Sequence, residues 1–153
     1  CSALIMDRHV AAPTRHAPAT LHRMDLADLA AIVYLVVSVI AIGFQLALAL
    51  GAPWGEYAMG GRYPGVFPPM MRLLAVGQAV ILGLLAFLVL SRAGLVVPEA
   101  TAEQPNVIWI AVLVSGASLW ANLNTKSAKE KRTWVPVAAV MLVSSLVVAL
   151  ATR

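Results

Sequence analysis

Four long apolar stretches alternate along the chain with shorter segments rich in polar residues, glycine or proline. An α-helix needs roughly 20 apolar residues to cross a bilayer, and each stretch approaches that length. The pattern predicts helices over about 26–50, 70–91, 107–123 and 134–151. We therefore expect an all-α fold, a four-helix transmembrane bundle over residues 24–153 with a Gly/Pro-rich first loop.

The N-terminal segment before the first apolar stretch has a different character. Residues 1–23 are polar, include three arginines and all three histidines, and sustain no apolar period. We expect this segment to be a flexible polar tail. Its histidines are interpreted as solvated side chains, so no metal site is predicted there.

Small and polar side chains within the apolar stretches indicate which helix faces meet other helices. Such side chains let backbones approach closely or hydrogen-bond across helices. They form one stripe in each of the first three stretches: Ser38, Ala41, Gln45 and Ala49; Ala75, Ala79 and Gly83, with Gln78 beside them; and Ala111, Ser115, Ser118 and Asn122.

The first loop, residues 51–72, has an unusual composition. It holds half of the ten glycines, four of the nine prolines and three charged residues, Glu56, Arg62 and Arg72. Such a density of glycine and proline excludes a continuous helix and predicts defined turns. A cation is unfavourable in the first turn of a helix, so Arg72 should reach lipid phosphate or pair with an acid. Glu56 is the nearest acid in sequence.

The third loop, residues 124–133, is strongly basic. Its cations are Lys126, Lys129, Lys131 and Arg132. Ser127-x-x-Glu130 fits a capping box, in which a hydroxyl and an acid satisfy each other's free backbone N–H groups. The last helix then either begins at the membrane surface and bends near Pro136, or is capped by Thr133 with Pro136 in its first turn.

Four crossings place the first and third loops on one membrane face, and the second loop with both termini on the other. Lysine and arginine near the membrane favour the cytoplasmic side. The third loop is basic and the second loop, residues 92–105, carries two glutamates. This favours a cytoplasmic location for the first and third loops, although the arginines of residues 1–23 favour the opposite orientation.

Helix parity therefore brings polar residues of the first and third loops to one face. The candidate site residues there, for a ligand or a lipid headgroup, are Glu56, Tyr57, Gly60, Gly61, Arg62, Tyr63, Arg72, Asn122, Asn124, Lys126, Ser127, Glu130 and Arg132. One hypothesis is a pocket under the first loop, where the Gly60 and Gly61 amides with Arg62 hold an anionic group such as a lipid phosphate. The favoured alternative is that these charges pair with each other and with headgroups to set the helix register.

The amino-acid composition favours membrane lipids over nucleic acid as partners of the protein. The chain is 61% hydrophobic and 12% charged, against about 45–50% and about 25% in soluble domains. Its net charge of +4 fits contact with anionic membrane lipids. Because no basic helix is interleaved with aromatic residues, we expect no nucleic-acid partner.

The sequence gives little support for catalysis or coupled transport. One cysteine excludes a disulfide or a cysteine-based zinc site within the chain, and the apolar region lacks a Ser-His-Asp set, an HExxH motif and paired carboxylates. No acid or base lies in the middle of a span, which argues against ion-coupled pumping. We therefore predict no catalytic residue, metal or cofactor.

Three segments in order resemble a widespread group of small bacterial membrane proteins with four predicted helices. They are ALGAPWGEYAMGGRYPGVFPPMMR, then SRAG after an apolar run, then ANLNTKSAKEKRTWVP. The resemblance covers about residues 49–151. It implies the fold and a membrane location, and it assigns no catalytic residue.

Three functional hypotheses follow from these observations. The favoured one is a non-enzymatic integral membrane protein that acts through helix or lipid contacts, as a homo-oligomer or an accessory subunit bound through the Ala75, Ala79 and Gly83 face. The second is a binder or carrier of a small amphipathic or lipid-like molecule in a pocket at the first loop. The third is a membrane-embedded enzyme, for which Glu56 would need a second titratable group nearby.

Overall fold

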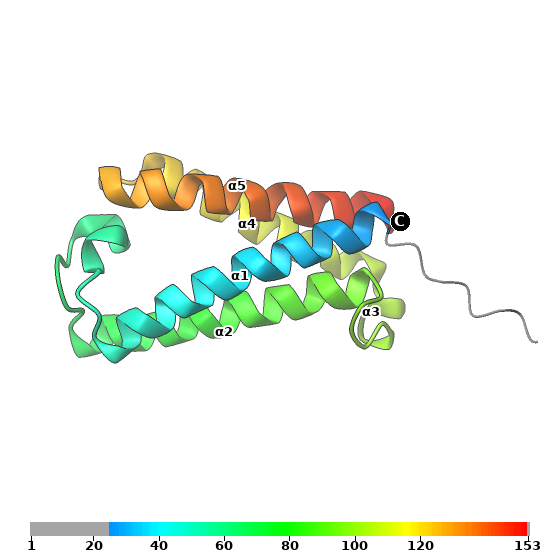
Figure 1. Cartoon of the computed structure of the whole chain (residues 1–153). Coiled ribbons are helices and arrows are strands. Elements are labelled where there is room, and N and C mark those ends of the chain that lie inside the picture. Colours follow the sequence, from blue (N-terminus) through cyan, green and yellow to red (C-terminus); the bar gives the residue numbers. More distant parts are fainter. Residues whose placement is uncertain (1–24, 153) are drawn as a thin grey trace, which may run out of the picture.

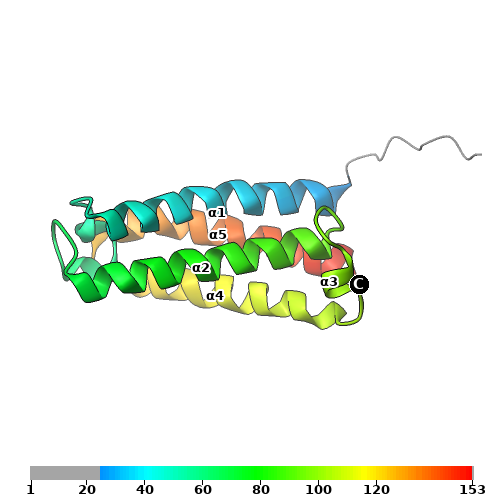
Figure 2. The ribbon, with the colours of Figure 1, turned by 90° about the horizontal axis from the view of Figure 1, so that it is seen from below.

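The fold is a bundle of long helices. The structure, a computed structural model, describes residues 25–152, and this part of the chain contains helices and turns but no strand. Four long helices run side by side (Figures 1 and 2): α1 (Leu26–Leu50), α2 (Pro69–Arg92), α4 (Ile108–Asn124) and α5 (Ala128–Ala151). The connections hold four short elements: η1 (Gly55–Tyr57), η2 (Met59–Gly61), α3 (Glu99–Ala102) and η3 (Pro105–Val107). The predicted all-α bundle is confirmed, whereas the predicted tail, residues 1–23, lies outside the described residues.

Four helical segments are long and apolar enough to cross a membrane. They are Leu26–Leu50, Pro69–Arg92, Pro105–Asn124 and Ala128–Ala151. Large apolar side chains cover their outer faces, and Leu73 and Leu113 are 65% and 71% exposed. Such surfaces are costly in water and suit contact with lipid tails. The chain is thus built as a multi-pass membrane protein.

The first helix begins with a reciprocal cap. The Asp25 carboxylate accepts the Asp28 N–H at 3.0 Å, and the Asp28 carboxylate accepts the Asp25 N–H at 3.2 Å. Both carboxylates lie at the positive end of the helix dipole, where negative charge is stabilising. The acids at the start of this span therefore define its first residue.

The last helix begins earlier than the predicted 134. It starts at Ala128 with Ser127 as its N-cap, and Pro136 lies inside it. Of the two alternatives, the earlier start at the Ser127-x-x-Glu130 pattern is therefore the one observed, and capping by Thr133 is wrong. The other three predicted helices match the observed ones to within one residue at each end.

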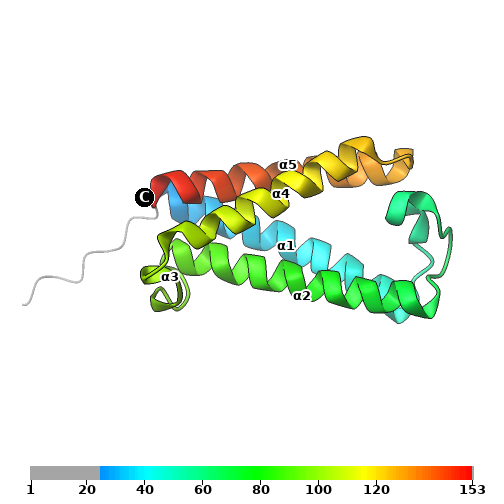
Figure 3. The same ribbon diagram turned by 180° about the vertical axis from the view of Figure 1, so that it is seen from behind.

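The long helices form two hairpins that meet unevenly. α1 packs extensively on α2, α4 on α5, and α1 on α5, whereas α2 and α4 touch much less. Figures 1 and 3 show the two hairpins close together near α3 and the C-terminus, and farther apart at the first loop. The main core, which includes Tyr34, Val89, Ile108 and Val148, joins both hairpins.

The predicted polar and small-residue faces pack only partly inside the bundle. Ser38 and Ala41 of α1 are buried, as are Ala75 and Ala79 of α2. The side-chain amide of Gln45 donates to that of Gln78 across α1 and α2 at 2.7 Å. A polar amide in hydrocarbon needs such a partner.

The first loop spans residues 51–68 in the structure and folds back on itself. The Gly55 N–H donates to the Gly65 carbonyl at 2.9 Å. Phe67 is buried in a second, smaller core with Leu48 and Ala75. The loop is therefore fixed to the α1–α2 hairpin at its C-terminal end.

Gly55 is predicted to be essential for this turn. A Cβ atom there would lie 1.9 Å from the Tyr63 carbonyl oxygen and 2.8 Å from that of Gly65. These are backbone atoms, so Gly55→Ala should cost about 1–3 kcal/mol or more of folding free energy. The measurement is thermal unfolding of the detergent-solubilised protein.

Gly43→Ala is the matched control. A Cβ on Gly43, within α1, meets nothing within 4 Å. Since alanine favours helices over glycine by about 1 kcal/mol, this variant should melt at the same temperature or higher. Equal destabilisation by the two variants would contradict the close backbone approach at Gly55.

Candidate functional site

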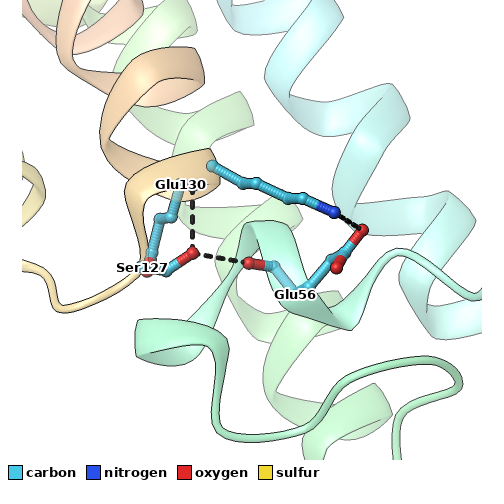
Figure 4. Close-up of polar contacts among 4 residues, drawn as sticks. Glu56, Ser127 and Glu130 are labelled. Atoms are coloured by element: carbon cyan, nitrogen blue, oxygen red, sulfur yellow. Dashed lines mark hydrogen bonds and ion pairs between the residues drawn. The ribbon is translucent and has the colours of Figure 1, made fainter.

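Loop-to-helix hydrogen bonds clasp the first loop to the start of α5. The Ser127 hydroxyl donates to the Glu56 carbonyl at 2.8 Å (Figure 4). The Glu130 carboxylate accepts the Gly60 N–H at 2.8 Å and also the Thr125 hydroxyl. We call this group, Glu56, Gly60, Thr125, Ser127 and Glu130, the loop clasp. It brings together residues about seventy positions apart in sequence.

The Ser-x-x-Glu pattern makes half of the expected capping box. The Ser127 hydroxyl accepts the Glu130 N–H at 3.2 Å, as a cap does. The Ser127 N–H, however, points to the Thr125 hydroxyl at 3.4 Å, and the Glu130 carboxylate turns to the first loop. The acid that the pattern assigned to a local cap therefore makes a tertiary contact.

Aromatic side chains reinforce the clasp. The Trp134 indole N–H donates to the Tyr57 carbonyl at 2.8 Å. The Phe44 ring of α1 packs edge-on against Trp134 at 4.7 Å between ring centres and stacks on Trp54 at 6.1 Å. These contacts connect α1, the first loop and α5 through the half-buried Phe44 and Trp134 rings and the more exposed Trp54 ring.

Gly61 lets the loop approach Ser127. Its φ is +71°, a left-handed conformation that side chains with a Cβ rarely adopt, and a Cβ there would lie 3.2 Å from the Ser127 Cβ. Both the conformation and the space therefore favour glycine. Gly60 precedes it with the same φ.

The charged candidates separate into different roles. Glu56 pairs with Lys129 at 2.7 Å, with both side chains largely exposed. Arg72 does not take Glu56 as its partner: its Nε donates to the Phe67 carbonyl at 2.8 Å, and its guanidinium lies against Gly51 at the end of α1. That end of a helix dipole favours a cation, which offsets the unfavourable position of Arg72 in its own helix.

A cavity of about 780 Å³ lies beneath the first loop, between the two hairpins. Its deep wall is formed by buried residues of α1 and α5, among them Ala41, Ala138 and Met141. Its roof includes Tyr57, Gly60 and other first-loop residues. The volume falls in the range of about 300–1,000 Å³ that is typical of small-molecule sites.

The cavity is most open between α2 and α4. The residues that these helices contribute are largely exposed, including Ile81, Ala117 and Ala121. The same two helices pack much less on each other than α1 packs on α2 or α4 packs on α5. In a membrane this seam would face the lipid tails.

The structure divides the predicted site residues into two groups. The cavity is lined by Tyr57, Gly60, Arg62, Asn122, Asn124, Lys126 and Glu130. The residues outside its lining are Glu56, Gly61, Tyr63, Arg72, Ser127 and Arg132. Tyr63 packs edge-on against Phe67, and Arg132 is exposed on α5.

Further polar lining residues come from inside the spans. They are Gln45 and Gln78, interpreted from the sequence as interhelical partners, together with Ser115 and Ser118, while Thr125 lines the cavity from the C-cap of α4. Ser115 also contacts the buried Tyr34 hydroxyl at 3.4 Å. Isolated polar positions within the apolar stretches indicate from the sequence that the residues inside the spans face other helices. The same pattern does not show that a cavity separates the helices there.

The arrangement fits binding better than catalysis. Glu56, the proposed proton carrier of an enzyme, lies outside the cavity lining in an exposed pair with Lys129. Within residues 25–152 no three His, Cys, Asp or Glu side chains gather to form a metal site. Asn122 and Asn124 donate to carbonyls of their own helix at 2.8 Å.

The Glu130 contact is predicted to hold the first loop in place. Glu130→Ala would remove the acceptor of the Gly60 N–H, so hydrogen exchange of first-loop amides should quicken and stability should fall by about 1–3 kcal/mol. Hydrogen–deuterium exchange with mass spectrometry measures the first effect, and thermal unfolding the second.

Lys129→Ala serves as the control, because it removes a loop contact on the same helical turn. Its exposed pair with Glu56 is screened by solvent, so its loss should change stability much less than the loss of the Glu130 contact. If both variants left the exchange of the first loop unchanged, Glu130 would not hold the loop.

Comparison with known proteins gives no relatives from which to transfer a function. No family model matches the chain, and neither a curated protein nor a solved structure matches it significantly. The resemblance to small four-helix bacterial membrane proteins therefore stays a prediction.

Proposed function

We propose that this multi-pass membrane protein binds a small amphipathic or lipid-like molecule in the cavity beneath the first loop. The observation that carries the proposal is the cavity itself, about 780 Å³ in volume, with mainly apolar walls that include a few polar side chains of α1, α2 and α4, and with its charged side chains at the loop end. A site with an apolar body and a few polar groups at one end matches a molecule with a tail and a head.

The position of the cavity supports a ligand that comes from the membrane. Its open seam lies between α2 and α4, whose outer faces carry exposed apolar side chains such as Leu84 and Leu113. A molecule dissolved in the bilayer could enter there without crossing water. The first loop then covers the head at the membrane surface.

We further propose that the first and third loops face the cytoplasm of a bacterial cell. The third loop and the first turns of α5 carry Lys126, Lys129, Lys131 and Arg132. A concentration of cations in a short loop favours the cytoplasmic side. The amphipathic ligand would then be taken from the inner leaflet.

The hypothesis of an accessory or oligomeric subunit has less support at the predicted face. Ala75 and Ala79 are buried within the chain. Gly83 is half-buried, and a Cβ there would meet nothing within 4 Å. Much of the small-residue face is thus already used inside one chain.

Filling the cavity is the direct test of binding. Ala117 of α4 lines the open seam and is exposed, so Ala117→Phe should block the cavity without disturbing the core. Lipids that remain after mild extraction and washing should fall at least about tenfold, a loss of about 1.4 kcal/mol in binding. Native mass spectrometry with lipid analysis measures the retained molecules.

Leu113→Phe is the matched control on the same helix. Leu113 is 71% exposed and lies outside the cavity lining. This variant should retain the wild-type amount of lipid. Equal retention by wild type and both variants, all folded, would refute ligand binding in the cavity.

A further inference from the structure

We infer that the head of the bound molecule is anionic and is held by Arg62 of the first loop and Lys126 of the third loop. This inference rests on the proposed binding function and adds the charge of the ligand and the residues that select it. It commits to a single-chain anionic amphiphile drawn from the membrane. The argument begins with the charges that line the cavity.

The charges of the cavity are unequal. Its charged lining residues are Arg62, Lys126 and Glu130. Glu130 is already engaged, because its carboxylate accepts the Gly60 N–H at 2.8 Å and the Thr125 hydroxyl. Two cations therefore face a carboxylate whose hydrogen-bonding capacity is partly used.

The two cations have no acid of their own. Within residues 25–152, neither the Arg62 nor the Lys126 side chain makes a hydrogen bond or an ion pair, and both residues are exposed. Lys129, in contrast, is paired with Glu56. A cation at a membrane surface is stabilised by an anion that approaches it.

The backbone brings the cations to the same part of the rim. Gly60 lies against Thr125, with 4.0 Å between a Cβ built on Gly60 and the Thr125 hydroxyl, and Gly61 lies against Ser127. Arg62 directly follows Gly61, and Lys126 lies between Thr125 and Ser127. The two side chains thus extend from neighbouring stretches of the first and third loops.

The first-loop amides predicted to bind an anion are occupied. The Gly60 N–H donates to Glu130, and the Gly61 N–H donates to the Ala58 carbonyl at 2.9 Å. The expected role of these two amides is therefore wrong in this structure. Side-chain cations remain as the groups that can hold the anion.

The apolar part of the site limits the tail. Below the rim the lining is mainly apolar, with Leu82, Leu85, Val137 and Met141. A cavity of about 780 Å³ is of the size that holds one drug-sized molecule. A single chain therefore fits better than the two chains of a bilayer phospholipid.

Two probes with one tail and opposite heads test this inference. The protein is placed in phosphatidylcholine nanodiscs and titrated with one of two probes that carry the same fluorophore. One probe is a labelled dodecyl phosphate and the other a labelled dodecyltrimethylammonium. The binding signal of each probe is corrected for its uptake by empty nanodiscs. The phosphate probe should bind at least about tenfold more tightly, which corresponds to about 1.4 kcal/mol.

Charge variants identify the residues responsible. Arg62→Gln and Lys126→Gln should each weaken the phosphate probe about tenfold and leave the trimethylammonium probe unchanged. Lys131→Gln is the matched control, because it removes the same charge from the start of α5 outside the cavity lining, so its phosphate affinity should stay at the wild-type value. The double variant Arg62→Glu, Lys126→Glu should prefer the trimethylammonium probe. Thermal unfolding confirms that each variant is folded.

The outcomes separate this inference from the binding proposal. If both probes bind equally and Ala117→Phe abolishes both, the cavity binds amphiphiles but the anionic preference is wrong. The inference also fails if Lys131→Gln weakens the phosphate probe as much as Lys126→Gln, since the effect would then come from general surface charge. If Ala117→Phe leaves phosphate binding intact, the probe binds elsewhere, which overturns this inference and counts against the proposed function.

Discussion

The contact between the Glu130 carboxylate and the Gly60 amide determines how the first loop closes the bundle. It joins the first turn of α5 to a loop that is otherwise fixed to the α1–α2 hairpin through Phe67. The hydroxyl of Ser127 adds a second hydrogen bond from the same turn. A half-buried carboxylate with two donors is well satisfied, and its loss would leave the Gly60 N–H and the Thr125 hydroxyl without this acceptor.

The cavity follows from this closure. The main core draws the two hairpins together near α3 and the C-terminus, while the smaller core around Phe67 holds only the first-loop end of α1 and α2. Small side chains of α4 such as Ala117 and Ala121 leave the space between the hairpins unfilled. Dispersion contacts between these walls and an apolar tail would stabilise the bundle.

The basic residues of the third loop make different contacts in the structure. Lys129 pairs with Glu56 and lies 5.6 Å above the Tyr57 ring, so it supports the closed loop. Lys126 lines the cavity, and Lys131 and Arg132 are exposed on α5 outside it. The basic residues together can favour one membrane orientation, while Lys126 alone among them lines the cavity.

Four spans, the glycine- and proline-rich break after the first, and the meeting of the first and third loops at one end could all be predicted from the amino-acid sequence. These features depend on local composition and on helix parity, which are readable along the chain. Tertiary structure alone decided that Glu130 leaves its local cap for Gly60, that Arg72 takes the Phe67 carbonyl in place of Glu56, and that Gln45 and Ser115 line a cavity. Those outcomes depend on the angle between the hairpins and on side-chain directions, which arise when distant segments pack together.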